Sequence, residues 1–226
     1  PVAQPNETLP ALQAHPLPPS LAQWHDASGQ GDYFDAIQPT NVGYLVWSHF
    51  PVSVYVEPPA EQSAEPPIRS PAESAGDRAQ DWFDAVQRAI QEWTTYLPLT
   101  VVSTPDSADI VFWRRAPRIE GFSAPNFRAR AAETEYQLYI QRSANAPATL
   151  SHRFTIVIRP RQSIYVEASA RHELGHALGI WGHSPIATDA LYFSQVRTPP
   201  PISVRDINTL RRVYEQPTRL GWPVEQ

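Results

Sequence analysis

The chain lacks cysteine, methionine and lysine altogether, so its 18 basic residues are all arginine. The absence of cysteine excludes disulfide bonds, thiolate metal ligands and cysteine nucleophiles, although it is compatible with any compartment. No apolar run approaches the ~20 residues that a membrane-spanning helix needs, so no membrane span is expected. The first residues, PVAQP, show neither the charged region nor the apolar stretch of a signal peptide.

What the chain does contain is typical of one globular domain. Its 226 residues and 42% hydrophobic content are enough for a full core. The net charge of −5 argues against a nucleic-acid partner or an anionic membrane surface. Proline is frequent, with 25 residues, which is about twice the usual proportion.

The prolines divide the chain into an arm and a domain. Residues 1–41 are rich in proline and have little periodicity, which predicts an extended N-terminal arm unable to bury a core of its own. A second proline-rich and acidic stretch at 58–74 indicates a linker inside the following region. We expect residues 42–226 to form one domain of mixed α/β (α+β) class.

Strands and helices alternate along this domain. Alternating or short apolar runs predict strands at 44–57, 99–104, 108–113, 135–141 and 154–159. Apolar residues at three- and four-residue steps predict helices at 76–97, 164–179 and 202–216. Ser163 and Ser203 are expected to cap the last two helices, and Gly179 is expected to end the first of these two.

A metal-binding motif lies in the second of these helices. His172 and His176 are four residues apart, so both imidazoles leave one helix face and can meet one zinc ion. Glu173 lies beside the pair and can take a proton from a water that zinc acidifies. A chance H-E-x-x-H in a chain of this length arises on the order of once in 150. Two unrelated surface histidines are therefore the weaker interpretation.

A catalytic zinc needs a third protein ligand, and His183 is the candidate. Gly179 and Gly182 allow a tight return of the chain after the helix, because glycine adopts positive φ at little cost. An alternative third ligand is Glu215 in the last helix, but it lies at the end of that helix without an acidic partner.

The segment HELGHALG, followed by His183-Ser184, resembles the metzincin metallopeptidases, and among them the bacterial matrixin-like peptidases. The family motif, H-E-x-x-H-x-x-G-x-x-H, has its third histidine one residue earlier than this chain. Two further segments resemble the family. In DALYF (189–193), Leu191 takes the place of the methionine in the family's turn below the metal, and ISVRDINTLRRVY (202–214) matches its terminal helix.

The resemblance implies a zinc endopeptidase with a twisted five-stranded sheet, a backing helix, an active-site helix and a C-terminal helix. It implies metal ligands His172, His176 and His183, with Glu173 as the general base. An antiparallel edge strand, expected within 121–141, would bind a protein or peptide substrate in extended form. Residues 192–201 would wall the pocket beyond the scissile bond. We expect one zinc ion and do not predict a calcium site. We also expect a monomer. A secreted or periplasmic location is expected from the resemblance alone.

Two alternatives stay open. The shifted His183 and the missing methionine are compatible with a zinc-binding domain that has little or no catalysis, although the presence of Glu173 favours an enzyme. Asp32 in the arm could coordinate zinc in a latent form, but a loop aspartate that begins a turn is the simpler interpretation. The remaining histidines occur singly and are expected to be surface or core residues: His15, His25, His49 and His152.

Overall fold

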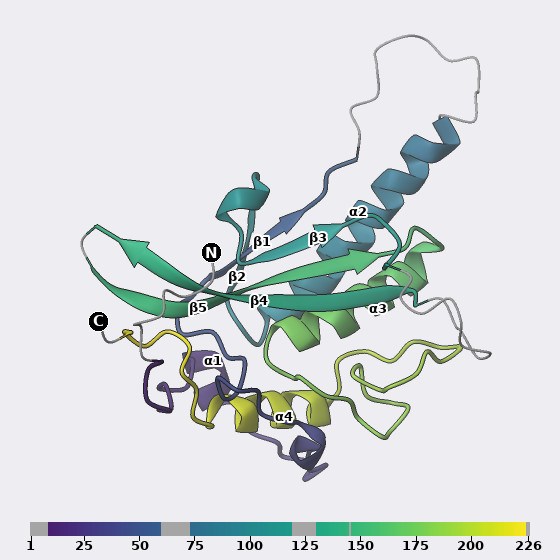
Figure 1. Cartoon of the computed structure of the whole chain (residues 1–226). Coiled ribbons are helices and arrows are strands. Elements are labelled where there is room, and N and C mark those ends of the chain that lie inside the picture. Colours follow the sequence, from purple (N-terminus) through teal and green to yellow (C-terminus); the bar gives the residue numbers. More distant parts are fainter. Residues whose placement is uncertain (1–8, 60–72, 119–129, 145, 225–226) are drawn as a thin grey trace, which may run out of the picture.

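The computed structural model describes residues 9–59, 73–118, 130–144 and 146–224, so most of the predicted 58–74 linker lies outside it. Figure 1 shows a twisted sheet with helices around it. The strands are β1 (Val52–Val56), β2 (Leu99–Val102), β3 (Ile110–Trp113), β4 (Ala132–Ser143) and β5 (Ala146–Ile158). The helices are α1 (Pro19–Gln23), α2 (Glu73–Thr94), α3 (Ser163–Ala177) and α4 (Val204–Tyr214), with short 3-10 turns η1 (Phe34–Ala36) and η2 (Pro105–Ser107).

The five strands form one mixed sheet in the order β2-β1-β3-β5-β4. Strands β2, β1, β3 and β5 run parallel to one another. Strand β4 is antiparallel to its neighbour β5. Strand β4 stands at the end of the order, so one of its edges has no partner strand among the described residues. The predicted mixed α/β class and five-stranded mixed sheet are confirmed, and the antiparallel edge strand overlaps the predicted range.

Alternation along β5 turns one face of the strand toward the core. From Leu150 onward every second residue is buried, while the residues between them are partly exposed. The buried series is Leu150, His152, Phe154, Ile156 and Ile158. Because successive side chains of a strand point to opposite faces, this series turns one face of the sheet toward the core.

Helix α2 covers that core with the apolar face that its sequence predicts. Trp82, Val86, Ile90 and Trp93 are all buried. In Figure 1 the helix crosses behind the sheet with α3 beside it. The indole nitrogen of Trp93 donates a hydrogen bond of 2.9 Å to the carbonyl oxygen of Arg171 on α3, which joins the two helices.

The caps of the last two helices differ. At α4, Ser203 forms the expected N-cap, and Asp206 completes a capping box with it. At α3 the prediction was wrong, because Ser163 is the first helical residue and Gln162 is the N-cap without a side-chain bond. The hydroxyl of Ser163 instead accepts a hydrogen bond from Arg88 of α2, so a tertiary contact replaces the cap.

The strand predicted at 44–57 is shorter than its apolar pattern suggests. Strand β1 begins at Val52, directly after Pro51. Upstream, Leu45, Val46 and Trp47 are buried in the main core from irregular backbone rather than from a strand. Their apolar character reflects burial, which periodicity alone does not distinguish from strand pairing.

The described part of the N-terminal segment packs closely on the rest of the chain. Leu21, Tyr33 and Ile37 belong to the same buried cluster as the sheet and α4. Figure 1 shows this segment next to α4, away from the sheet. No helix in the described ranges is long and apolar enough to cross a lipid bilayer.

Candidate metal centre

The two motif histidines leave the same face of α3. The Nε2 atoms of His172 and His176 lie 3.1 Å apart. Their ring centroids are 4.7 Å apart, with ring planes nearly perpendicular at 88°. Two nitrogens bound at 2.0–2.1 Å to one tetrahedral ion would be separated by roughly 3.3 Å. The observed separation therefore fits a shared metal ion.

His183 joins this pair from the segment after the helix. Its ring centroid lies 5.2 Å from that of His172 and 4.8 Å from that of His176. One possible ligand atom from each histidine lies within 4.8 Å of the others. His176 is buried and His183 is exposed, so the group opens toward solvent. Three imidazoles with an open fourth position are the ligand set of many catalytic zinc sites.

Tight turns absorb the extra residue between His176 and His183. Gly179 has a φ of 129°, in the range that favours glycine. The amide of Trp181 then donates to the carbonyl of Gly179, and the amide of Gly182 donates to the carbonyl of Ile180, both at 2.9 Å. These two overlapping three-residue turns shorten the path of the chain. They bring His183 back to the helix despite the longer spacing.

The neighbours of Gly182 leave no room for a side chain at this position. A Cβ atom at this position would lie 2.6 Å from the carbonyl oxygen of Ala36 and 2.9 Å from Cδ1 of Ile37. Gly182 and Ile37 form an isolated antiparallel bridge. The N-terminal segment therefore passes directly against the residue that precedes His183.

Backbone carbonyls fix the orientation of both motif histidines. Nδ1 of His172 lies 2.8 Å from the carbonyl oxygen of Ala190, and Nδ1 of His176 lies 2.8 Å from that of Ile180. A carbonyl oxygen only accepts, so each Nδ1 carries a proton, and a ring in its neutral form then keeps its lone pair on Nε2. Such carbonyl contacts are typical of metal-ligating histidines. Two lone pairs facing each other at 3.1 Å repel unless a cation lies between them.

The pKa values of two of the three histidines are lowered. Burial, followed by the charge of His172, lowers the pKa of His176 well below its usual range. The same two causes lower the pKa of His183 to about 4. Both rings are therefore neutral near pH 7, which is the form that binds a metal ion.

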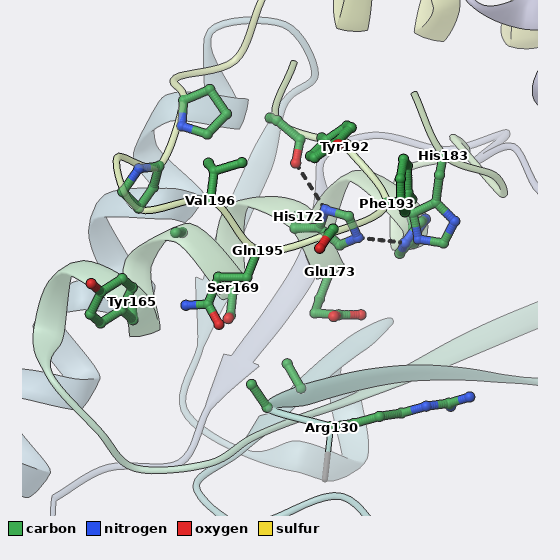
Figure 2. Close-up of a pocket in the computed structure, with 18 of the residues that line it drawn as sticks. Arg130, Tyr165, Ser169, His172, Glu173, His183, Tyr192, Phe193, Gln195 and Val196 are labelled. Carbon is green, nitrogen blue, oxygen red and sulfur yellow. Dashed lines mark hydrogen bonds between the residues drawn. The ribbon is translucent and has the colours of Figure 1, made fainter. Parts of the chain in front are cut away.

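Glu173 lies on the side of the histidines that faces β4. Figure 2 shows its carboxylate between His172 and the chain at Arg130. The hydroxyl of Thr134 donates a hydrogen bond of 2.7 Å to Oε2 of Glu173. Burial raises the pKa of Glu173, while His172 and the bond from Thr134 act in the opposite direction. Among the described residues, the three-histidine group does not include this carboxylate, so it is free to act as a base.

Leu191 packs beneath the histidine pair. Its side chain is fully buried, and a Cβ atom added at Gly175 would lie 2.6 Å from its Cδ2. Gly175 stands between His172 and His176 on α3, so Leu191 contacts the helix directly at the motif. The leucine that the resemblance assigns to the turn below the metal thus packs against the helix turn that carries both histidines.

Buried carboxylates that the sequence analysis did not assign hold the turn at Leu191. Oδ2 of Asp206 accepts a hydrogen bond of 2.9 Å from the amide of Ala190, whose carbonyl orients His172. Asp189 is fully buried and accepts hydrogen bonds from Ser203 and Arg205. The sequence pattern does not single out Asp189, because two of its partners, Ser203 and Arg205, come from the N-cap and first turn of α4.

The three histidines line a cleft of about 1290 Å³. One wall is the start of β4 with the residues before it, the base is α3, and the other wall is the segment after Leu191. Most of the predicted 192–201 wall lines this cleft: Tyr192, Phe193, Ser194, Gln195, Val196, Arg197, Pro199 and Pro200. Figure 2 shows Tyr165, Ser169, Gln195 and Val196 on the same side of His172.

Other candidate ligands lie elsewhere. Asp32 pairs with Arg212 of α4 at 2.8 Å and accepts a hydrogen bond from the amide of Phe34, as a turn aspartate does. Glu215 pairs with Arg211. In the described part of the chain, the metal-ligating group contains none of the single histidines. The proposal that Asp32 coordinates the metal therefore finds no support.

No model of a known protein family matches this chain, and a search of curated proteins finds no similar sequence. The resemblance to metzincins therefore rests on the sequence segments at 172–184, 189–193 and 202–214 alone.

Proposed function

We propose that the chain is a zinc-dependent endopeptidase that resembles the metzincins. The observation that carries this proposal is the His172–His176 pair, whose Nε2 atoms face each other at 3.1 Å with His183 beside them. Three nitrogen ligands and an open side suit zinc better than the oxygen-seeking ions magnesium and calcium.

The residues of the cleft supply the remaining parts of a hydrolytic site. Zinc, when bound, would supply a Lewis acid that acidifies water and polarises a peptide carbonyl. Glu173 lies beside the histidines and is held by Thr134, so its carboxylate can take the proton from the attacking water and pass it to the leaving amine. The raised pKa of Glu173 favours uptake of the proton from water.

The open edge of β4 supports a peptide as the substrate. Residues 130–134 line the cleft, and β4 has β5 on one side and no described strand on the other. An extended peptide can add to such an edge through backbone hydrogen bonds. This arrangement would lay the peptide across the metal centre. A monomeric, secreted or periplasmic enzyme is part of the proposal on the strength of the resemblance alone.

The deciding experiment measures zinc per chain by elemental analysis together with cleavage of casein. The intact chain is expected to hold one zinc ion and to cleave casein. His183→Ala is expected to lose both, and Glu173→Ala is expected to keep zinc while cleavage falls by about 10²–10⁴-fold. Exposed residues provide the matched controls His25→Ala and Glu135→Ala, which should behave as the intact chain.

The same measurements separate the alternative, a zinc-binding domain without catalysis. A zinc-loaded intact chain that cleaves no protein would favour that alternative. Unchanged zinc content in His183→Ala would mean that another residue completes the ligand set, and an intact chain without zinc would refute both functions.

A further inference from the structure

The cleft extends from the metal centre along α3 toward the start of the helix. His172, Ser169 and Tyr165 stand three and four residues apart and line the cleft from one helix face. Ser169 is three residues before His172, which corresponds to about 4.5 Å along the helix axis. A substrate side chain next to the reacting bond can therefore reach this part of the cleft.

Arg161 holds its guanidinium group at this place. Its Nη2 atom donates to the hydroxyl of Ser169 at 2.5 Å and to the carbonyl oxygen of Tyr165 at 3.0 Å. Its Nη1 atom donates to Oε1 of Gln195 at 3.2 Å. The guanidinium also lies over the ring of Tyr165, at 5.5 Å from the centroid. Contacts from both α3 and the opposite wall thus fix the cation in the cleft.

Within the described part of the chain, Arg161 has no acidic partner, unlike Arg130, which also lines the cleft. Arg130 pairs with Glu133 at 2.6 Å, and Asp189 pairs with Arg205 at 3.1 Å. Among the described residues, no carboxylate pairs with Arg161, and its Nε atom is buried without an acceptor. A partly buried cation without a counter-charge carries a desolvation cost that an incoming carboxylate can offset.

We propose that Arg161 makes this end of the cleft a binding site for the carboxylate side chain of an aspartate or glutamate in the substrate. This inference rests on the proposed peptidase function and names its preference: an acidic residue beside the bond that is cut. Two of the five N–H groups of the guanidinium remain unused, and Gln195 supplies a neutral acceptor that a carboxylate can replace with a stronger, charge-assisted bond.

The test uses two peptides that differ only by glutamate or glutamine at the position after the cleaved bond. Their cleavage is measured with the zinc-loaded chain, and their binding with the metal-free chain by fluorescence anisotropy. The glutamate peptide is expected to be preferred about tenfold in both measurements at low salt, with less preference at high salt. Arg161→Gln is expected to remove the preference, and Arg161→Glu to reverse it toward a lysine peptide.

Two controls keep the test specific. Arg159→Gln removes the same charge two residues earlier, outside the cleft lining, and should keep the preference. Arg161→Lys keeps the charge, so a folded Arg161→Lys chain should retain part of the preference, and thermal unfolding checks that each variant is folded. The inference is overturned if the intact chain cleaves and binds both peptides equally well, or if it binds neither. A binding preference for glutamate without any cleavage would instead sustain the acidic site and refute the peptidase function.

Discussion

The hydroxyl of Tyr33 donates a hydrogen bond of 2.5 Å to Oδ1 of Asp206, although 173 residues separate them in the chain. Asp206 in turn accepts from the amide of Ala190, and the carbonyl of Ala190 accepts from His172. The N-terminal segment is thereby connected to His172, a proposed metal ligand, through two hydrogen-bonded residues. All of these groups except the His172 side chain are buried.

Tyr33→Phe is expected to lower the free energy of unfolding by about 1.5–3 kcal/mol, because a buried carboxylate loses a hydrogen bond. Zinc affinity should fall less than the 10–100-fold that is typical when a direct partner of a ligating histidine is removed. Urea unfolding and zinc titration check both values. Tyr44→Phe is the matched control, since Tyr44 is partly buried and stacks on Phe34. Equal zinc affinity and stability in the Tyr33 and Tyr44 variants would exclude the connection.

A second prediction concerns the contact between Gly182 and the N-terminal segment. Gly182→Ala would place a methyl group 2.6 Å from the backbone oxygen of Ala36, which cannot move without shifting its segment. We expect a loss of about 1–3 kcal/mol in stability and weaker zinc binding, because His183 follows directly. Gly29→Ala serves as the control. Its Cβ meets no atom within 4 Å, so it should affect stability only through its φ of 63° and leave zinc binding unchanged. Unaltered zinc affinity in Gly182→Ala would show that this contact does not position His183.

The sequence predicted those parts of the molecule that local spacing determines. Steps of three and four residues placed the buried face of α2, from Trp82 to Trp93, because a helix repeats every 3.6 residues. The same regularity put His172 and His176 on one face. The prediction of a strand at residues 44–47 was wrong. Apolar residues that a loop buries and apolar residues that a strand buries look alike in sequence.

The partners of the site residues could not be predicted in this way. Thr134 reaches Glu173 from another element, and Tyr33 reaches Asp206 across most of the chain. Such pairs depend on how distant segments meet, for which a single sequence carries no local signal. Ser163 illustrates the same limit, because its contact with Arg88 overrode its expected role as a cap.

A third prediction concerns Thr134 as a positioning residue for Glu173. Thr134→Val keeps the shape of the side chain but removes the donor to Oε2 of Glu173. The turnover number kcat on a peptide substrate should fall about tenfold with little change in KM, because the bond orients the base rather than the substrate. Thr134→Ser retains a hydroxyl and should restore most of kcat, while zinc content stays constant in both variants. A higher KM with unchanged kcat would instead mean that Thr134 contacts the substrate.

The last prediction follows from His152, which is 3% exposed and stacks on Trp47 with ring centroids 4.0 Å apart. Burial is the main cause that lowers the pKa of His152 to about 3. The unfolded chain, with an ordinary histidine pKa near 6.5, therefore binds a proton that the folded chain does not bind between these two values. Stability should fall with decreasing pH in this window, by about 1.4 kcal/mol per pH unit from this group, and no further below it.

His152→Phe keeps an aromatic ring against Trp47 and removes the titrating group. The free energy of unfolding of the variant, relative to that of the unaltered chain, is expected to rise as the pH falls from 6.5 toward 4. The reason is that residue 152 of the variant takes up no proton on unfolding. Urea unfolding of the metal-free chains at a series of pH values measures this difference. The effect is separate from that of His172, His176 and His183, which both chains share. His25→Gln, at an exposed site, should follow the unaltered chain at every pH. Parallel curves for His152→Phe and the unaltered chain would mean that His152 is protonated in the folded state, contrary to its burial.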